Sequence, residues 1–382
     1  MVTGIKIHRK KSILLAAAIV FFLLLDSSWI FMHVFPESIR HIVSFVVLLV
    51  SLKIVNKRIS IYKNQLAIIW VTAIYFYGHF VSQMSVLNLI DIVILPLVIA
   101  GCSGCIKTSD RKTCSIAAIF LFLLNSLVCI YEYKNGVNLF YFDMNNMIRF
   151  RSTGIWGHPL YTAVIEAATM FFILLSEIRK VLKICFWFLG LSILFMCDAR
   201  SAIVAVVACT VVLLYWQKVF SLRNTIYIVA VVIVSFYLFE YLAESDLGGK
   251  LFTKTSSGSL NYDGAEYRLI AIKILFDLDF ATLLTGVENQ FEYVHKYGVI
   301  CAENGFVARV LVFGLPIAIM TFYLNIKTLL YICKELSMKY KCVIVALLIV
   351  SAITNQSLLT GYVWNTYMLM YLLLVSPSLK NK

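Results

Sequence analysis

Long, uninterrupted runs of apolar residues are the feature that most restricts what this chain can fold into. Residues 12–32 and 225–242 are two such runs, and both are longer and more evenly apolar than the core helices of soluble proteins. The whole sequence of 382 residues is 61% hydrophobic and 14% charged, whereas a soluble domain is about half apolar and about a quarter charged. The sequence therefore predicts an all-α polytopic membrane protein, with a single integral membrane domain over residues 1–382.

The apolar runs also predict how many times the chain crosses the membrane. Segmentation gives about 12 transmembrane helices. They lie near 13–32, 38–54, 65–82, 86–104, 114–131, 159–176, 184–197, 201–217, 225–241, 305–326, 342–356 and 361–376. The first run follows a basic N-terminus, contains Asp26 and has no small-residue cleavage site, so we interpret it as an uncleaved signal anchor.

The basic residues recur in short clusters at every second connection between these runs. The clusters hold about two-thirds of all Lys and Arg, as the positive-inside rule requires for cytoplasmic connections. They are Lys6/Arg9/Lys10/Lys11, Lys53/Lys57/Arg58, Lys107/Arg111/Lys112, Arg179/Lys180/Lys183, Lys218/Arg223, Lys327/Lys334/Lys339/Lys341 and Lys380/Lys382. Both termini are therefore expected in the cytoplasm. Topology accounts for the net charge of +13, and no single basic patch indicates a nucleic-acid partner.

The same alternation places two longer connections outside, a smaller loop at 132–158 and a large loop at 243–304. Acidic residues concentrate in the large loop, where residues 265–284 have the pattern of a helix that lies on the bilayer surface or packs against the spans. A bond between the outer cysteines Cys197 and Cys301 is permitted by this placement but supported by nothing else.

Basic residues on the outer side need an explanation other than topology. Arg149, Arg151 and His158 crowd together before the span at 159–176, and Arg200 lies in the next outer turn. Each could simply reach lipid phosphates at the interface or form a structural ion pair. Their convergence at one side of the membrane favours a functional role.

Two further sites belong to the large loop. Arg268 lies on the expected surface helix. At the end of the loop, Glu303 and Asn304 precede the next span, and Arg309 lies about one turn inside it. A buried arginine needs a counter-charge, which we expect from Glu303 or Asp198.

Outer arginines suit a diphosphate, because guanidinium groups make bidentate, permanently charged contacts with phosphate oxygens. A nearby carboxylate or histidine can accept the proton of an attacking hydroxyl. Together these groups predict a metal-independent glycosyltransferase that uses a lipid-diphosphate donor, and they require no cofactor. Cys102 and Cys105 form a CxxC pair, but no second pair or nearby histidine completes a zinc site.

Four short motifs lie in order within residues 110–330. They are Arg-x-x-Gly with Gly-His-Pro at 151–159, a small-Arg-Ser turn at 199–201, an Arg-containing helix at 266–269 followed by "LLTGV" (283–287), and Asn304-Gly305 followed by Gly314. In these motifs the chain resembles the O-antigen polymerase/O-antigen ligase superfamily of bacterial membrane glycosyltransferases. It departs from that superfamily at Glu303, where His is common, and at Gly286-Val287-Glu288, where Gly-x-Gly is expected.

The resemblance implies a polymerase of lipid-linked oligosaccharide repeat units, such as those of O-antigen in lipopolysaccharide, at the periplasmic face of the bacterial inner membrane. Such an enzyme transfers the growing glycan from undecaprenyl diphosphate to a hydroxyl of the next lipid-linked repeat unit. The implied partners are the undecaprenyl-diphosphate-linked donor and acceptor, membrane lipids and a chain-length regulator protein.

The resemblance also assigns expected roles to the outer polar residues. The catalytic set is Glu303 as the base, His295 as the other candidate for the base, and Arg200 and Arg268 on the diphosphate. The substrate-binding set is Arg149, Arg151, His158, Asn304 and Arg309.

Three other functions remain open from the sequence. One is an O-antigen ligase that transfers the glycan to lipid A core, although the missing histidine at Glu303 weakens that interpretation. The second is a flippase or other transporter of lipid-linked oligosaccharide, which would need a central polar pathway. The third is a lipid-binding scaffold without catalysis.

Overall fold

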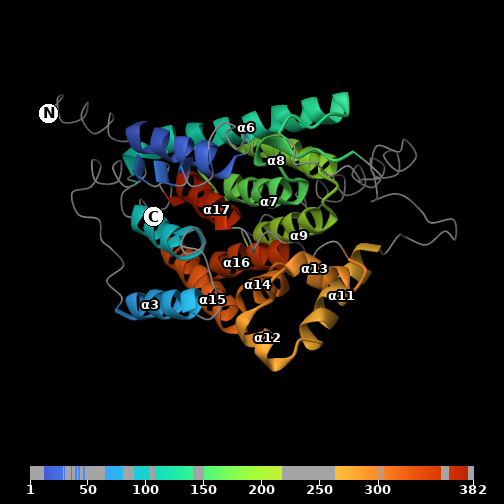
Figure 1. Ribbon diagram of the computed structural model, residues 1–382. Coiled ribbons are helices and arrows are strands. Elements are labelled where there is room, and N and C mark those ends of the chain that lie inside the picture. Colours follow the sequence, from blue (N-terminus) through green and yellow to red (C-terminus); the bar gives the residue numbers. More distant parts are fainter. Residues whose placement is uncertain are drawn as a thin grey trace.

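The structure is a computed structural model that describes residues 13–28, 30, 36, 39–40, 42–43, 46–47, 65–80, 90–103, 106, 108–140, 150–216, 263–299, 302, 304–353 and 361–376. Within these residues every regular element is a helix and no strand occurs, which confirms the all-α prediction (Figure 1). The α-helices are α3 (Gln65–Phe80), α5 (Leu95–Cys102), α6 (Arg111–Asn135), α7 (Pro159–Leu175), α8 (Lys180–Met196), α9 (Arg200–Trp216), α11 (Asp263–Phe276), α12 (Phe280–Thr285), α13 (Gln290–His295), α14 (Gly305–Phe313), α15 (Leu315–Ile332), α16 (Met338–Ile353) and α17 (Gly361–Leu374). Short π and 3-10 segments are η1 (Leu23–Ser27), η2 (Ile90–Ile94), η3 (Thr108–Asp110) and η4 (Gly154–Trp156).

Helices α6, α8, α7 and α9 stack in that order, and the two ends of the stack differ in chemistry (Figure 1). At one end, which we name the Arg111 end, Arg111 at the start of α6 forms an ion pair with Glu177 just after α7. At the other, the Glu132 end, Glu132 in the last turn of α6 bonds the loop that leads into α7. Short connections join α7 to α8 and α8 to α9, so α7 and α9 both begin at the Glu132 end.

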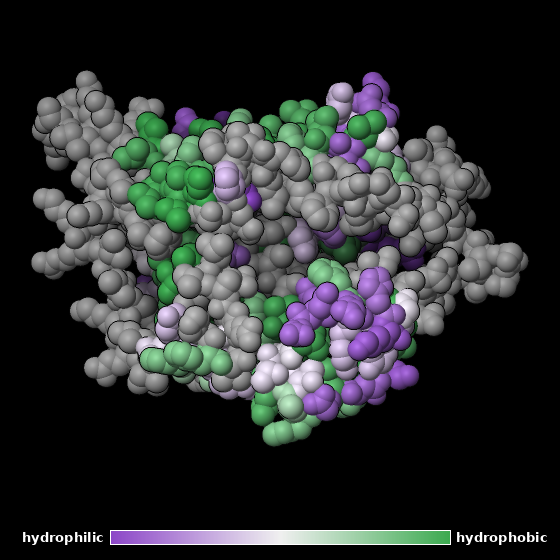
Figure 2. Space-filling view, in the orientation of Figure 1, coloured by the Kyte–Doolittle hydropathy of each residue, from purple (hydrophilic) through white to green (hydrophobic). Residues whose placement is uncertain are grey.

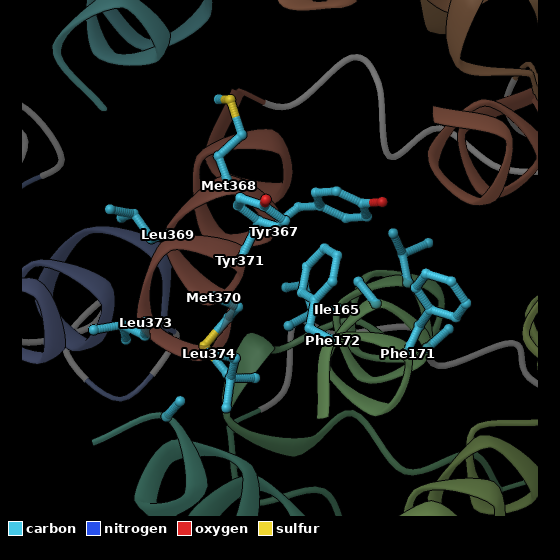
Figure 3. Packing of buried hydrophobic residues seen from close by; sticks show 14 of the residues in the cluster. Ile165, Phe171, Phe172, Tyr367, Met368, Leu369, Met370, Tyr371, Leu373 and Leu374 are labelled. Carbon is cyan, nitrogen blue, oxygen red and sulfur yellow. The ribbon is translucent and has the colours of Figure 1, made fainter. Parts of the chain in front are cut away.

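Helix α17 packs along α7 through aromatic contacts (Figure 3). The ring of Phe172 meets the rings of Tyr367 and Tyr371 edge-on, with centroids 5.0 and 5.4 Å away. Phe172 is near the C-terminal end of α7 and Tyr371 is near that of α17, so both helices end at the Arg111 end. The last described helix therefore ends on the side where the sequence places the basic clusters.

Helix α6 buries polar side chains inside the protein and exposes large apolar side chains. Its buried face carries Asn125 and Glu132, both 0% exposed. Its opposite face carries Phe120 and Leu127, which are 53% and 65% exposed. A soluble helix has the reverse arrangement, whereas a helix in lipid keeps its polar groups inside the bundle. The distribution on α6 therefore favours a lipid surround.

Length and hydropathy agree with this orientation. Two helical stretches are long and apolar enough to cross a membrane, Thr108–Asn135 and Leu315–Ile332. Shorter apolar helices cover Ile13–Leu25, Ile90–Gly101, Pro159–Leu175, Arg200–Trp216 and Val363–Leu374. The predicted segment at 225–241 and most of that at 38–54 lie outside the described residues.

The predicted continuous span at 305–326 is wrong, because the chain breaks at Gly314 into α14 and α15. The ring of Phe306 lies 5.9 Å from that of Phe322, and Arg309 bonds Thr321 at 3.1 Å. Residues before Gly314 therefore contact residues that follow it by a similar number of positions. This pattern shows that the chain reverses at the break, so that α14 and α15 form a helical hairpin. The apolar pattern did not indicate this reversal because both arms of the hairpin are apolar.

The predicted single helix at 265–284 also differs from the structure, which has α11 and α12 with a break between them. Asp279 ends the break by capping α12, since its carboxylate accepts from the backbone N–H of Thr282 at 2.9 Å. Ala271 and Ile274 of α11 are buried against residues of α13 and α14. Figure 2 shows hydrophilic residues gathered on the visible face of this α11–α13 region.

Candidate functional site

A fully buried carboxylate, that of Glu132, organises the loop at the Glu132 end of the bundle. It accepts hydrogen bonds from the backbone N–H groups of Thr153, Gly154 and Leu139 at 2.7, 2.8 and 2.9 Å. It also accepts from the Thr153 hydroxyl at 3.0 Å. These donors compensate the burial of the charge and fix the loop. Glu132 was not among the residues predicted from the sequence, although an acidic residue at the end of an apolar run is a usable signal.

Gly154, from the Arg-x-x-Gly motif, lies where no larger residue fits. Its φ is +59°, and a Cβ atom added there would lie 2.3 Å from Oδ1 of Asn125. That same oxygen accepts from the backbone N–H of Ile155 at 2.9 Å. The Asn125 amide also donates to Glu166 of α7, so the loop, α6 and α7 share one polar contact. The glycine is required by this close approach.

Arg151 joins the loop to the turn between α8 and α9. Its Nε donates to the carbonyl of Cys197 at 2.9 Å and its Nη2 to that of Asp198 at 3.2 Å. The next residue, Ser152, donates its backbone N–H to Met196 at 3.0 Å. The guanidinium therefore positions this turn, in addition to any contact with substrate that the sequence predicts for it.

Arg200 begins α9 in the same turn. The turn reverses through Asp198, which has a φ of +51° in the left-handed region that Asp tolerates better than most residues. Arg151 is thus held by the carbonyl two residues before Arg200. The structure therefore holds Arg151 against the turn that carries Arg200.

His158 is at the same corner and caps α7. Its Nδ1 accepts from the backbone N–H of Leu160 at 3.2 Å, and its ring lies 4.4 Å from that of Tyr161. Burial, with the positive charge of Arg151 nearby, lowers the pKa of His158 to about 3. The imidazole is therefore neutral at physiological pH. Because Nδ1 is an acceptor, the proton is on Nε2, which is a hydrogen-bond donor rather than a base.

We name this group, made of Arg151, His158 and Arg200 with the first turns of α7 and α9, the arginine corner. Helix N-termini carry partial positive charge, so both helices add to the field of the two guanidinium groups. The field and the N–H donors favour an anion. The corner can bind and orient a phosphate group, but His158, with its proton on Nε2, does not suit the role of a general base.

The second predicted site surrounds the start of α14. Asn304 caps this helix, since its side-chain oxygen accepts from the backbone N–H groups of Phe306 and Val307 at 3.0 and 3.1 Å. Figure 1 places α16 between α9 and α14, and α16 packs against both. The described part of the chain thus presents two polar groups of residues, the arginine corner and the α14 terminus, on either side of α16.

Arg309 lies deep in the bundle and not on its surface. It is 1% exposed, and Asp91 of η2 acts on it as a counter-charge. The sequence did not predict this partner, and the expected partner Glu303 lies outside the described residues. Asn365 of α17 donates to the Asp91 carboxylate at 3.0 Å. The sequence could not indicate this partner, because Asp91 and Arg309 are far apart along the chain and meet only after the helices pack.

The "LLTGV" motif packs against the break between α14 and α15. The backbone N–H of Val287 donates to the carbonyl of Leu311 at 2.7 Å. A Cβ atom on Gly314 would lie 1.9 Å from the carbonyl oxygen of Leu284, and one on Gly286 would lie 2.8 Å from that of Leu311. The two motif glycines therefore allow the large loop to contact the hairpin backbone directly.

The remaining predicted residues are less closely defined. His295 is exposed at the end of α13, which packs against α14. Arg268 belongs to α11, but its side chain lies outside the described part of the structure. Glu303 and Arg149 lie outside the described residues altogether, as does Cys301.

Among the described residues no group of three or more His, Cys, Asp or Glu side chains could hold a metal ion. No protein-family model and no curated protein matches the sequence of this chain.

Proposed function

We propose that this protein is a polytopic membrane glycosyltransferase that polymerises lipid-linked oligosaccharide repeat units at the outer face of the bacterial inner membrane. About 12 spans with both termini in the cytoplasm would place the Glu132 end in the periplasm. The polar inner face and apolar outer face of α6 support the membrane setting. The observation that carries the proposal is the arginine corner, where Arg151 is held by the turn that carries Arg200.

In the proposed reaction, a hydroxyl of the incoming lipid-linked unit attacks the anomeric carbon of the growing glycan. The bond from that carbon to the diphosphate oxygen breaks, and undecaprenyl diphosphate leaves with the electron pair. Arg200 stabilises the charge that develops on the leaving group, and Arg151 adds its field while it holds the turn. The Nε2–H of neutral His158 donates to a phosphate or sugar oxygen.

The proton of the attacking hydroxyl needs an acceptor from elsewhere. We assign it to Glu303, next to the Asn304 cap of α14, with His295 as the second candidate. Arg268 of α11 is assigned to the diphosphate together with Arg200. These assignments rest on the resemblance of the motifs and on the position of α11 and α13 against α14.

Deletion of the gene separates this function from the alternatives. A polymerase predicts cells that still carry a surface glycan of one repeat unit. A ligase predicts polymer that accumulates on undecaprenyl diphosphate, without transfer to lipid A core. A flippase predicts no surface glycan, and repeat units trapped on the cytoplasmic side. Buried Arg309 and half-buried Asp91 favour a transporter as the second candidate, because charged groups inside a bundle can line a polar pathway.

A further inference from the structure

Two cysteines that are far apart in the sequence meet beneath the arginine corner. Cys129 lies near the end of α6, and Cys197 is the residue at which α8 ends. Both are fully buried free thiols. The Cys129 thiol interacts with the Cys197 thiol, so the two side chains lie close to each other.

The backbone around these thiols is held together from the side of the loop. The Ser152 hydroxyl donates to the carbonyl of Cys129 at 2.9 Å, and its backbone N–H donates to Met196 at 3.0 Å. Arg151 donates to the carbonyl of Cys197 at 2.9 Å. One dipeptide therefore contacts both cysteine-bearing segments and holds them next to each other.

We propose that Cys129 and Cys197 form a structural disulfide that ties α6 to the turn between α8 and α9. Both lie at the Glu132 end, which the topology places in the oxidising periplasm, where disulfides form and persist. This pairing differs from the bond between Cys197 and Cys301 that topology alone permits.

The reaction is a thiol–disulfide exchange with an oxidised dithiol oxidase of the periplasm. The thiolate of one cysteine attacks a sulfur atom of the oxidase disulfide and displaces one oxidase thiolate, which leaves a mixed disulfide. The second cysteine thiolate then attacks its partner's sulfur and releases the oxidase as a dithiol. Two electrons and two protons pass to the oxidase. Because both thiols are buried in the folded protein, the exchange belongs to folding, before the helices close over them.

The bond would strengthen the support of the arginine corner. The carbonyls of Cys129 and Cys197 are the acceptors that hold Ser152 and Arg151, so a bond between the two residues fixes both acceptors relative to each other. It also closes a long loop, and the stabilisation expected from a cross-link increases with loop length. Reduction of the bond would loosen the turn that carries Arg200 before it affected the rest of the bundle.

The test is the thiol state of the wild-type protein. Cells are quenched in acid, and the membranes are dissolved in SDS and alkylated before and after reduction, with each cysteine mapped by mass spectrometry. We expect Cys129 and Cys197 to react only after reduction, and an unreduced digest to contain the linked peptides. Cys185 and Cys342, which are exposed and lie outside the pair, should react without reduction. Full alkylation of Cys129 and Cys197 in SDS without reductant would overturn the proposal.

A variant identifies the partner. In Cys129→Ser, Cys197 should become reactive without reductant, whereas continued protection would show that Cys197 bonds another cysteine and that the proposed pair is wrong.

A second variant, Asn135→Cys, tests the topology separately. Asn135 lies on the exposed end of α6, so labelling of the new cysteine by an impermeant maleimide on intact spheroplasts reports which side of the membrane this end faces. If the maleimide labels position 135 from outside but no linked Cys129–Cys197 peptide is found, the topology stands and the disulfide is rejected. Labelling only after lysis rejects both. Neither readout depends on glycosyl transfer, so the fate of the proposed function is measured separately.

Discussion

Nε of Arg151 lies 2.9 Å from the carbonyl oxygen of Cys197, and this contact joins segments 46 residues apart. Nη2 of the same side chain bonds the carbonyl of Asp198 at 3.2 Å. The arginine is therefore fixed by the turn that delivers Arg200 to the start of α9. A change in the loop before α7 should for this reason alter the position of Arg200 as well.

The carboxylate of Glu132 should be the most sensitive polar group of this loop. Glu132→Gln keeps the shape but replaces one accepting oxygen with an NH₂ group, which faces donors that then lack a partner. We expect a loss of about 1–3 kcal/mol in the free energy of unfolding, measured from thermal or denaturant unfolding in detergent. Glu177→Gln, which breaks the half-exposed pair with Arg111, is the matched control and should lose at most about 1 kcal/mol. Equal effects would show that Glu132 does not organise the loop.

Alanine substitutions at two glycines with similar φ angles distinguish the cost of a steric clash from the cost of the left-handed backbone conformation. Gly136 and Gly154 have φ values of +66° and +59°, but only Gly154 has a neighbour within reach of an added Cβ. Gly136→Ala should cost about 1–2 kcal/mol, as expected for a side chain in the left-handed region. Gly154→Ala should cost clearly more, because its Cβ would displace Asn125 from Ile155 and Glu166. Unfolding midpoints of the two variants, measured in one detergent, test this, and indistinguishable midpoints would contradict the contact.

His158 should make the fold sensitive to acid. Folding lowers its pKa from 6.5 to about 3, so the folded protein binds this proton more weakly than the unfolded chain. The contribution of the neutral ring to stability is therefore fully present above pH 6.5 and decreases as the pH falls from there toward about 3. His158→Asn keeps a residue that caps helices well and removes the titration. Unfolding midpoints followed from pH 8 to pH 4 should fall less steeply in the variant, and parallel curves would exclude His158 as the titrating group.

Glu303 is proposed as the base from the motif resemblance, in which it directly precedes Asn304. Glu303→Gln cannot accept a proton, so we expect the polymerisation rate to fall by about 10²–10⁴ while donor binding stays intact. Glu303→His should recover part of the rate, since neutral histidine is a base. Glu292→Gln, on the exposed first turn of α13 in the same loop, should leave the rate unchanged. Near-full activity of purified Glu303→Gln at matched protein level would transfer the role to His295.

The sequence predicted the helices around the arginine corner well because their ends carry local signals. Pro159 after His158 favours the first turn of α7, and the charged residues between α7 and α8 interrupt the apolar pattern. The break between α14 and α15 was missed because apolar periodicity does not report chain direction. Gly314 and Pro316 within an apolar run were a local signal of that break.

The contacts inside the site could not be predicted in the same way. The pairs Arg309 with Asp91 and Cys129 with Cys197 each join residues that are distant in the sequence. Such pairs depend on how the helices pack, which a single sequence does not encode locally. By contrast, the convergence of Arg151, His158 and Arg200 agrees with the expected topology, because His158 and Arg200 lie at the starts of α7 and α9 and Arg151 lies in the loop that leads into α7.

The central claim is that the arginine corner stabilises a leaving undecaprenyl diphosphate during polymerisation. The direct measurement is chain growth by the purified protein in liposomes, supplied with an undecaprenyl-diphosphate-linked repeat unit as both donor and acceptor. Wild-type protein should give a ladder of polymer, as should Arg179→Ala, which removes an exposed arginine at the opposite end of the bundle. Arg200→Ala should lose about 2–5 kcal/mol of transition-state stabilisation, and Arg200→Lys should recover only part of the rate, because lysine keeps the charge but loses the planar fork. A full ladder from correctly folded Arg200→Ala would contradict the account.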